Sequence, residues 1–204
     1  MTKASRRTLL ATLVALPLLP GAAHAQGDGP EVAIERFHAV LLEVMRNART
    51  LGVQGRDQRL RPVMEATFNL PAMTRIAVGP SWNNIPPAQQ QALVQAFSDW
   101  VIATYANRFD GYGGESFQTL GVTPLQNGGQ LVRTQLNRPN DTPVALSYRM
   151  QNSGGAWQVV DVYYQTGSIS ELASRRSEFT AILREGGPER LVADLRQRTA
   201  TLLR

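Results

Sequence analysis

Cysteine is absent from this chain of 204 residues, and histidine occurs only twice. Without thiols the protein can form no disulfide, thiolate zinc site or iron–sulfur cluster, and it has no cysteine nucleophile. Long hydrophobic runs are also lacking, since no stretch approaches the roughly 18 apolar residues of a membrane-spanning helix. The chain has no long run of lysine and arginine residues that would indicate a nucleic-acid partner. A hydrophobic core must therefore hold the protein together.

The first 25 residues have the layout of a secretory signal peptide. Lys3, Arg6 and Arg7 give a positively charged start, and residues 9–19 form an apolar core. Ala23, His24 and Ala25 then match the small-x-small pattern of a cleavage site. We expect cleavage after Ala25 and export by the Sec route or, because residues 5–10 resemble a twin-arginine signal, by the Tat route. The remaining chain, 26–204, has 18 basic and 16 acidic residues and is close to neutral.

Catalytic motifs are missing from residues 26–204. Their one histidine, His38, follows Ile34 by four residues and precedes Leu41 by three, which places it on the apolar side of a predicted helix. We therefore expect a packed or edge histidine and no Ser-His-Asp triad. No nucleophile elbow, phosphate-binding glycine loop, dinucleotide fingerprint or metal-ligand spacing occurs.

Carboxylates and arginines are the remaining polar candidates. Folding could bring two acids together for acid–base chemistry, and the candidates are Asp99, Asp110, Glu115 and Asp161. For Asp161, which lies in a strand pattern, we expect an ion pair with an arginine. The possible partners are Arg108, Arg133, Arg149, Arg175 and Arg176. Some of these arginines could instead bind a phosphate, because the guanidinium fork matches its geometry.

Apolar periodicity predicts an α+β fold with one domain over 26–204. Steps of three and four residues predict helices over 31–48, 55–68, 70–78 and 87–109, and a last pair that begins with the capping box Ser168/Glu171 and is divided at residues 186–188. Residues 81–85 should form a loop. Period-two alternation and hairpin turns predict four strands, over 115–124, 130–138, 143–151 and 156–164. Helices should pack on this curled, four-stranded antiparallel meander.

An ordered set of motifs resembles a known family. Residues 68–79, FNLPAMTRIAVG, are similar to the pattern F-D-L-P-x-M-x-R-x-x-L-G of the toluene-tolerance family, the periplasmic phospholipid-binding MlaC proteins. Further matching segments follow in order at Trp82, 132–134, 143–150, 155–162 and 176–179. Asn69 stands where the family usually has aspartate. Residues 167–175 also depart from the common pattern and resemble a branch associated with hopanoid gene clusters.

The resemblance implies a periplasmic lipid carrier without cofactor, metal or catalytic residues. The fold would be an NTF2-like or cystatin-like arrangement that encloses an apolar cavity for acyl chains. The partners would be a phospholipid or hopanoid-type lipid, an inner-membrane Mla ABC transporter complex and an outer-membrane lipoprotein complex, and the protein would be a monomer. We predict tail contacts from Met73, Ile76, Trp82, Phe97, Val101, Tyr105, Leu146, Tyr148, Val160 and Val162, and head-group or partner contacts from Arg149 and Arg176.

Two other classes of function remain open from the residues alone. An exported hydrolase would need two carboxylates that converge in a polar cleft. A protein-binding adaptor would use the outer face of the sheet and bind no small ligand. An apolar cavity with a path from outside distinguishes the carrier from both.

Overall fold

The protein is described by a computed structural model over residues 29–164 and 169–204. The predicted signal peptide, 1–25, and the predicted helix cap Ser168 lie outside these residues. Among the described residues, none of the helices is both long and apolar enough to cross a bilayer.

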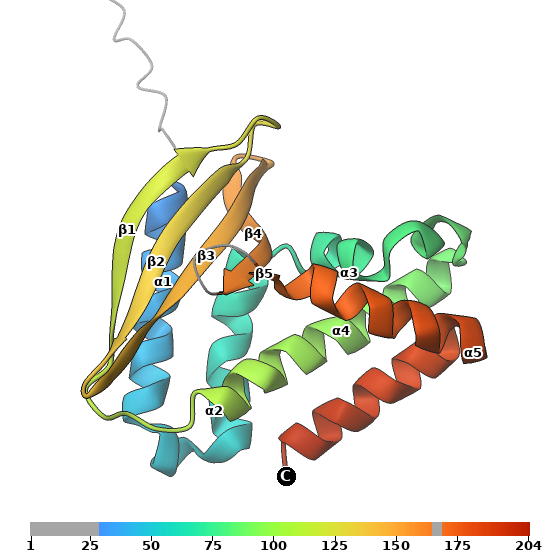
Figure 1. Cartoon of the computed structure of the whole chain (residues 1–204). Helices are drawn as coiled ribbons and strands as arrows, with labels where there is room; N and C mark the ends of the chain where they lie inside the picture. Colours follow the sequence, from blue (N-terminus) through green and yellow to red (C-terminus); the bar gives the residue numbers. More distant parts are fainter. Residues whose placement is uncertain (1–28, 165–168) are drawn as a thin grey trace, which may run out of the picture.

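Figure 1 shows a twisted antiparallel sheet on one side and a group of helices on the other. The elements in chain order are α1 (Pro30–Arg46), α2 (Ala48–Thr67), α3 (Leu70–Val78), the 3-10 helix η1 (Gly79–Asn84), α4 (Pro87–Arg108), β1 (Ser116–Pro124), β2 (Gln130–Arg138), β3 (Asp141–Ser153), β4 (Ala156–Tyr164), β5 (Ile169–Ser170) and α5 (Glu171–Leu202). The predicted α+β class and the four-stranded meander are confirmed.

The sheet has the order β1-β2-β3-β4-β5, with every neighbour antiparallel. Register shifts interrupt all three long pairings, at Thr119/Gly121, Leu136/Arg138 and Arg149/Met150. Because each bulge increases local twist and bends its strand, the sheet curls around α1. The two-residue strand β5, which periodicity does not reveal, adds a fifth strand beside β4.

The helices differ from expectation mainly at glycines. Gly52 and Gly187 both have positive φ with extended ψ, a conformation essentially restricted to glycine, and they kink α2 and α5. The kink in α5 confirms the predicted division at 186–188 and folds its two halves back on each other (Figure 1). The expected loop over 81–85 is largely helical: η1 extends over Gly79–Asn84, because proline and polar residues suit a tight 3-10 turn.

The core lies where α1, α2 and α4 meet the concave face of the sheet. An aromatic group of Phe37, Phe68, Tyr105 and Tyr148 has ring centroids 5.0–6.5 Å apart at steep angles. His38 is buried beside this group, stacks on Phe117 and lies 2.9 Å from the Tyr148 hydroxyl. The prediction of a packed histidine is confirmed.

Candidate functional site

The candidate site is a row of three spaces along one side of α4, two lined mainly by apolar side chains and a third, beside the second half of α5, lined mainly by polar ones. Its middle space, the central pocket, lies between α4, β4 and the first half of α5. The stripe of α4 side chains repeats at three- and four-residue steps, because such positions share one face of a helix. The lining comprises Phe68, Met73, Phe97, Trp100, Val101, Thr104, Tyr105, Arg108, Phe109, Val162, Tyr164, Glu171, Leu172 and Arg175.

The central pocket is narrow, with a volume of about 40 Å³. Two wider neighbours share walls with it. The sheet-side pocket, about 450 Å³, shares Tyr105, Arg108, Phe109 and Tyr164 and extends to Leu146 on the concave face of the sheet. The helix-side pocket, about 490 Å³, shares Trp100, Thr104 and Arg175 and extends along the second half of α5. Single layers of side chains thus separate the three spaces.

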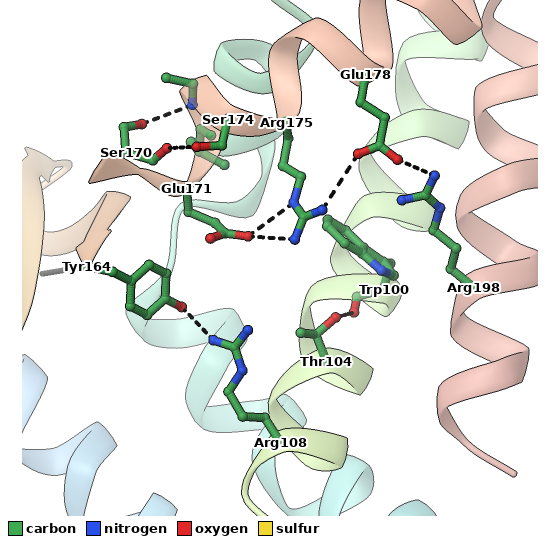
Figure 2. A network of polar contacts seen from close by, with 12 residues as sticks. Trp100, Thr104, Arg108, Tyr164, Ser170, Glu171, Ser174, Arg175, Glu178 and Arg198 are labelled. Carbon is green, nitrogen blue, oxygen red and sulfur yellow. Dashed lines mark hydrogen bonds and ion pairs between the residues drawn. The ribbon is translucent and has the colours of Figure 1, made fainter. Parts of the chain in front are cut away.

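Charged side chains of α4 and α5, here called the rim, line part of the central pocket, and Figure 2 shows the polar contacts that they make. Arg108 donates a hydrogen bond of 3.0 Å to the Tyr164 hydroxyl, and its guanidinium carbon lies 5.6 Å from the centre of that ring. Arg175 donates two hydrogen bonds, of 3.1 and 3.0 Å, to Glu171 and lies over Trp100 at 5.2 Å. The rim therefore carries two arginines, each placed against an aromatic ring.

Ion pairs hold the two halves of α5 together above this rim. Glu178 from the first half accepts from Arg198 of the second half and lies 3.6 Å from Arg175. Burial acts to raise the pKa of Glu178, but hydrogen bonds and charge from the two arginines outweigh burial and lower it. Burial also raises the pKa of Tyr105 and of Tyr164, so both phenols are neutral at physiological pH.

The structure brings seven of the ten predicted tail-contact residues to these spaces. Met73, Phe97, Val101, Tyr105 and Val162 line the central pocket. The sheet-side pocket is lined by Leu146 and Tyr148, together with Tyr105 again.

The other three residues line none of the three spaces. Ile76 and Trp82 are half-buried and pack on the edge of the core. Val160 is buried where β4 bulges against β3. These side chains have the same apolar character as the pocket residues but pack in the core or against its edge.

The two predicted head-group arginines lie away from the pockets. Arg176 donates two hydrogen bonds to the Ile76 carbonyl, so it ties α5 to α3. Arg149 lies on the face of β3 opposite Tyr148, in a separate surface pocket beside Leu131 and Tyr163. The alternation of side chains along a strand already indicates that Arg149 lies on the other face, because residues 146, 148 and 150 share the face of Tyr148. The rim positions belong instead to Arg108 and Arg175.

Only two of the four acidic candidates share a pocket. Asp99 pairs with Arg61 at 2.7 Å, on the outer side of α4. Asp110 and Glu115 line the edge of the sheet-side pocket, where Glu115 accepts from a backbone N–H at 2.6 Å. Within the part of the chain that the structure describes, no group of three or more His, Asp or Glu residues could hold a metal ion.

The buried carboxylate Asp161 has a different role from the expected ion pair. Its oxygens accept from the Ser170 hydroxyl at 2.6 Å, from its own strand at Val162 N at 2.9 Å and, at 3.5 Å, from Leu172 N. Asp161 therefore joins β4 to the beginning of α5, because a carboxylate is favoured beside the free N–H groups of a helix N-terminus. Ser170, which accepts from Ala173 N, is the cap of α5 where Ser168 was expected.

Comparison with known proteins gives this site a context. A family model described as MlaC protein matches residues 35–197. The chain belongs to the MlaC family. Among solved structures, a phospholipid-binding protein from Ralstonia solanacearum, determined in complex with a phospholipid, is 22% identical and superposes with a TM-score of 0.75. The match covers 87% of this chain and 100% of that chain, and it shows that the two share a fold.

The MlaC-family motif has a clear structural role at Asn69. Its side-chain oxygen accepts from Ala72 N at 3.0 Å and caps α3, and its amide nitrogen donates to Gln158 of β4 at 3.2 Å. Asparagine caps a helix about as well as the aspartate usual at this position. The substitution therefore preserves the helix that positions Met73 in the central pocket.

Proposed function

We propose that this protein is a non-enzymatic, periplasmic carrier of phospholipid within an Mla-type transport system. The observation that carries the proposal is the pair of mainly apolar pockets beside α4, the central and the sheet-side pocket, which share Tyr105, Arg108, Phe109 and Tyr164 as their common wall. A carrier needs such spaces, because each methylene removed from water contributes about 0.8 kcal/mol. Two acyl tails of about sixteen carbons would cost roughly 25 kcal/mol to expose.

Acyl chains would enter by displacing the partitions. The central pocket, at about 40 Å³, is far narrower than its two neighbours and cannot hold an acyl chain unless its lining side chains move. Rotation of Tyr105 and Phe109 would join it to the sheet-side pocket, and rotation of Trp100 would join it to the helix-side pocket. Tyr105 and Phe109 are half-buried in this arrangement, and contact with the acyl chains would offset the cost of opening.

Organic extraction of protein purified from the periplasm, followed by mass spectrometry, tests the proposal. We expect phospholipid at a defined molar ratio to protein. A pentacyclic lipid in place of phospholipid would assign the protein to hopanoid transport, and a protein free of lipid would refute the carrier function.

Transfer between membranes needs its own experiment. Donor vesicles that contain a fluorescent phospholipid and unlabelled acceptor vesicles are separated by a dialysis barrier that only the protein crosses. We expect label to reach the acceptor in proportion to protein concentration. Co-purification with an inner-membrane ABC transporter complex and with an outer-membrane lipoprotein complex tests the two partners. If no label reaches the acceptor vesicles and neither complex co-purifies, the function is limited to lipid binding.

A further inference from the structure

One arginine at the rim is not neutralised by a carboxylate. Arg175 pairs with Glu171 and Glu178, and Arg138, at the far end of the sheet-side pocket, pairs with Asp141. Arg108 forms no ion pair with any residue in the ranges 29–164 and 169–204, and its side chain is exposed. Its charge is therefore available to a ligand.

The position of Arg108 is as informative as its charge. Arg108 is the last residue of α4, and with Tyr164 it lines both the central and the sheet-side pocket. A molecule with one hydrocarbon chain in each pocket would have its branch point beside these two residues. The polar end of such a molecule would therefore lie within reach of the guanidinium.

The hydrogen-bonding pattern leaves donors for an anion. Arg108 uses one N–H on the phenol oxygen of Tyr164, at 3.0 Å, and the guanidinium has five N–H groups. Since that oxygen accepts from Arg108, the phenol proton is free to point toward a second acceptor. Burial raises the pKa of Tyr164, so the phenol retains this proton. Hydrogen bonds from the Arg108 guanidinium and the Tyr164 phenol to an anion would be charge-assisted, and such bonds are about twice as strong as neutral ones.

We infer that Arg108 and Tyr164 bind the phosphate of the lipid, and that this pair makes the carrier prefer phosphate-bearing lipids over neutral two-chain lipids. The inference rests on the proposed function. One phosphate is enough to neutralise the site. Arg138 and Arg175, the other two arginines that line the central and sheet-side pockets, are already paired with carboxylates. Tyr164 acts by orienting the guanidinium and by donating its own proton.

Competition between two lipids with identical acyl chains tests the inference. Purified protein is equilibrated with vesicles that contain equal amounts of phosphatidylethanolamine and diacylglycerol, and the bound lipids are extracted and quantified. We expect the wild type to favour the phospholipid. Arg108→Gln should lower the ratio of bound phospholipid to diacylglycerol about tenfold, the loss typical of a hydrogen-bonded charge. Tyr164→Phe should also lower it, by up to about tenfold, because the phenol would donate to a charged phosphate oxygen.

Control variants separate phosphate recognition from general damage. Arg184→Gln removes the same charge from an exposed position on α5 that lines none of the three spaces, and it should leave the ratio unchanged. Arg108→Lys keeps the charge without the planar fork and should retain part of the preference. Equal ratios in the wild type and Arg108→Gln, with both lipids bound, would overturn the inference and leave the carrier function intact. Absence of both lipids from the wild type would instead refute the carrier function.

A free anion is the other source of the same chemistry. Inorganic phosphate alone, added to lipid-free protein, should raise the melting temperature of the wild type and of Arg108→Gln equally. Stabilisation confined to the wild type would identify a site for free phosphate and would overturn the assignment to a lipid head group.

Discussion

Replacing Leu146 by tryptophan should strongly weaken lipid binding while leaving the protein folded. Leu146 is buried on the concave face of β3 and lines the sheet-side pocket, whose volume of about 450 Å³ gives an indole ring space to enter. The ring would then occupy space that an acyl chain needs. If it displaces about three methylene groups into water, the loss is about 2.4 kcal/mol, or roughly 50-fold in affinity.

The same substitution at Val101 should behave differently. Val101 lines the central pocket, where about 40 Å³ is open, so a tryptophan there must push neighbouring side chains from their rotamers. Overpacking of this kind costs about 1–3 kcal/mol of folding stability. Val101→Trp should therefore lose both stability and lipid, whereas Leu146→Trp should lose lipid alone.

Ala145 supplies the matched control for both variants. It precedes Leu146 on β3 and, by strand alternation, lies on the opposite face of the sheet. Displacement of a fluorescent phospholipid and urea unfolding are measured for each variant and for Ala145→Trp, which should resemble the wild type in both. If Leu146→Trp folds normally and binds phospholipid as tightly as the Ala145→Trp control, the sheet-side pocket holds no acyl chain and our account of the site is wrong.

Three further predictions concern stability. Burial lowers the pKa of His38 from 6.5 to about 3, so the unfolded chain binds the proton first. The contribution of neutral His38 to the free energy of unfolding is complete above about pH 6.5, and about 3 kcal/mol of it is lost by about pH 4.5. Urea unfolding curves measured over this pH range should show that loss in the wild type and not in His38→Gln. Gly187→Ala should cost about 1–3 kcal/mol because of its positive φ, and Gly111→Ala, in open space at ordinary φ, should be nearly neutral by calorimetry. Glu178→Gln removes a half-exposed pair with Arg198 and should cost at most about 1 kcal/mol at pH 7, and nothing once the pH falls below the lowered pKa of that carboxyl; an undiminished loss in acid would contradict the ion-pair assignment.

Much of the fold follows from periodicity because each element satisfies its own local pattern. The predicted bounds of α3, β2 and β4 agree with the structure. Elements that depend on distant contacts were missed. The strand β5 and the cap at Ser170 both depend on β4: Ser170 donates to Asp161, and β5 exists by pairing with Tyr163 and Tyr164. No local pattern distinguishes that cap from a serine two residues earlier.

The site was predictable in part, and the limit lies in packing. Helical spacing places Phe97, Val101 and Tyr105 on one face of α4, and that face lines the central pocket. Spacing does not reveal whether an apolar face meets a cavity or other side chains, and for this reason it does not distinguish Trp82 and Val160, which line none of the three spaces, from the residues that do. The rim arginine was recognisable only as one of five candidates, since its isolation from carboxylates is a property of the folded chain.

The narrowness of the central pocket is consistent with a carrier that must also release its lipid. Complete transfer of two acyl tails from water would contribute about 25 kcal/mol, beyond the roughly 20 kcal/mol at which non-covalent affinities saturate, and a lipid held that tightly would not leave. A site whose lining closes on itself recovers apolar burial when the chains depart, so only the difference between the two packings favours binding. Tyr105 and Phe109 are well suited to this exchange, because both rings border the central and the sheet-side pocket and can pack against a chain in either one. A rigid, open cavity of the same total volume would bind more tightly and transfer more slowly.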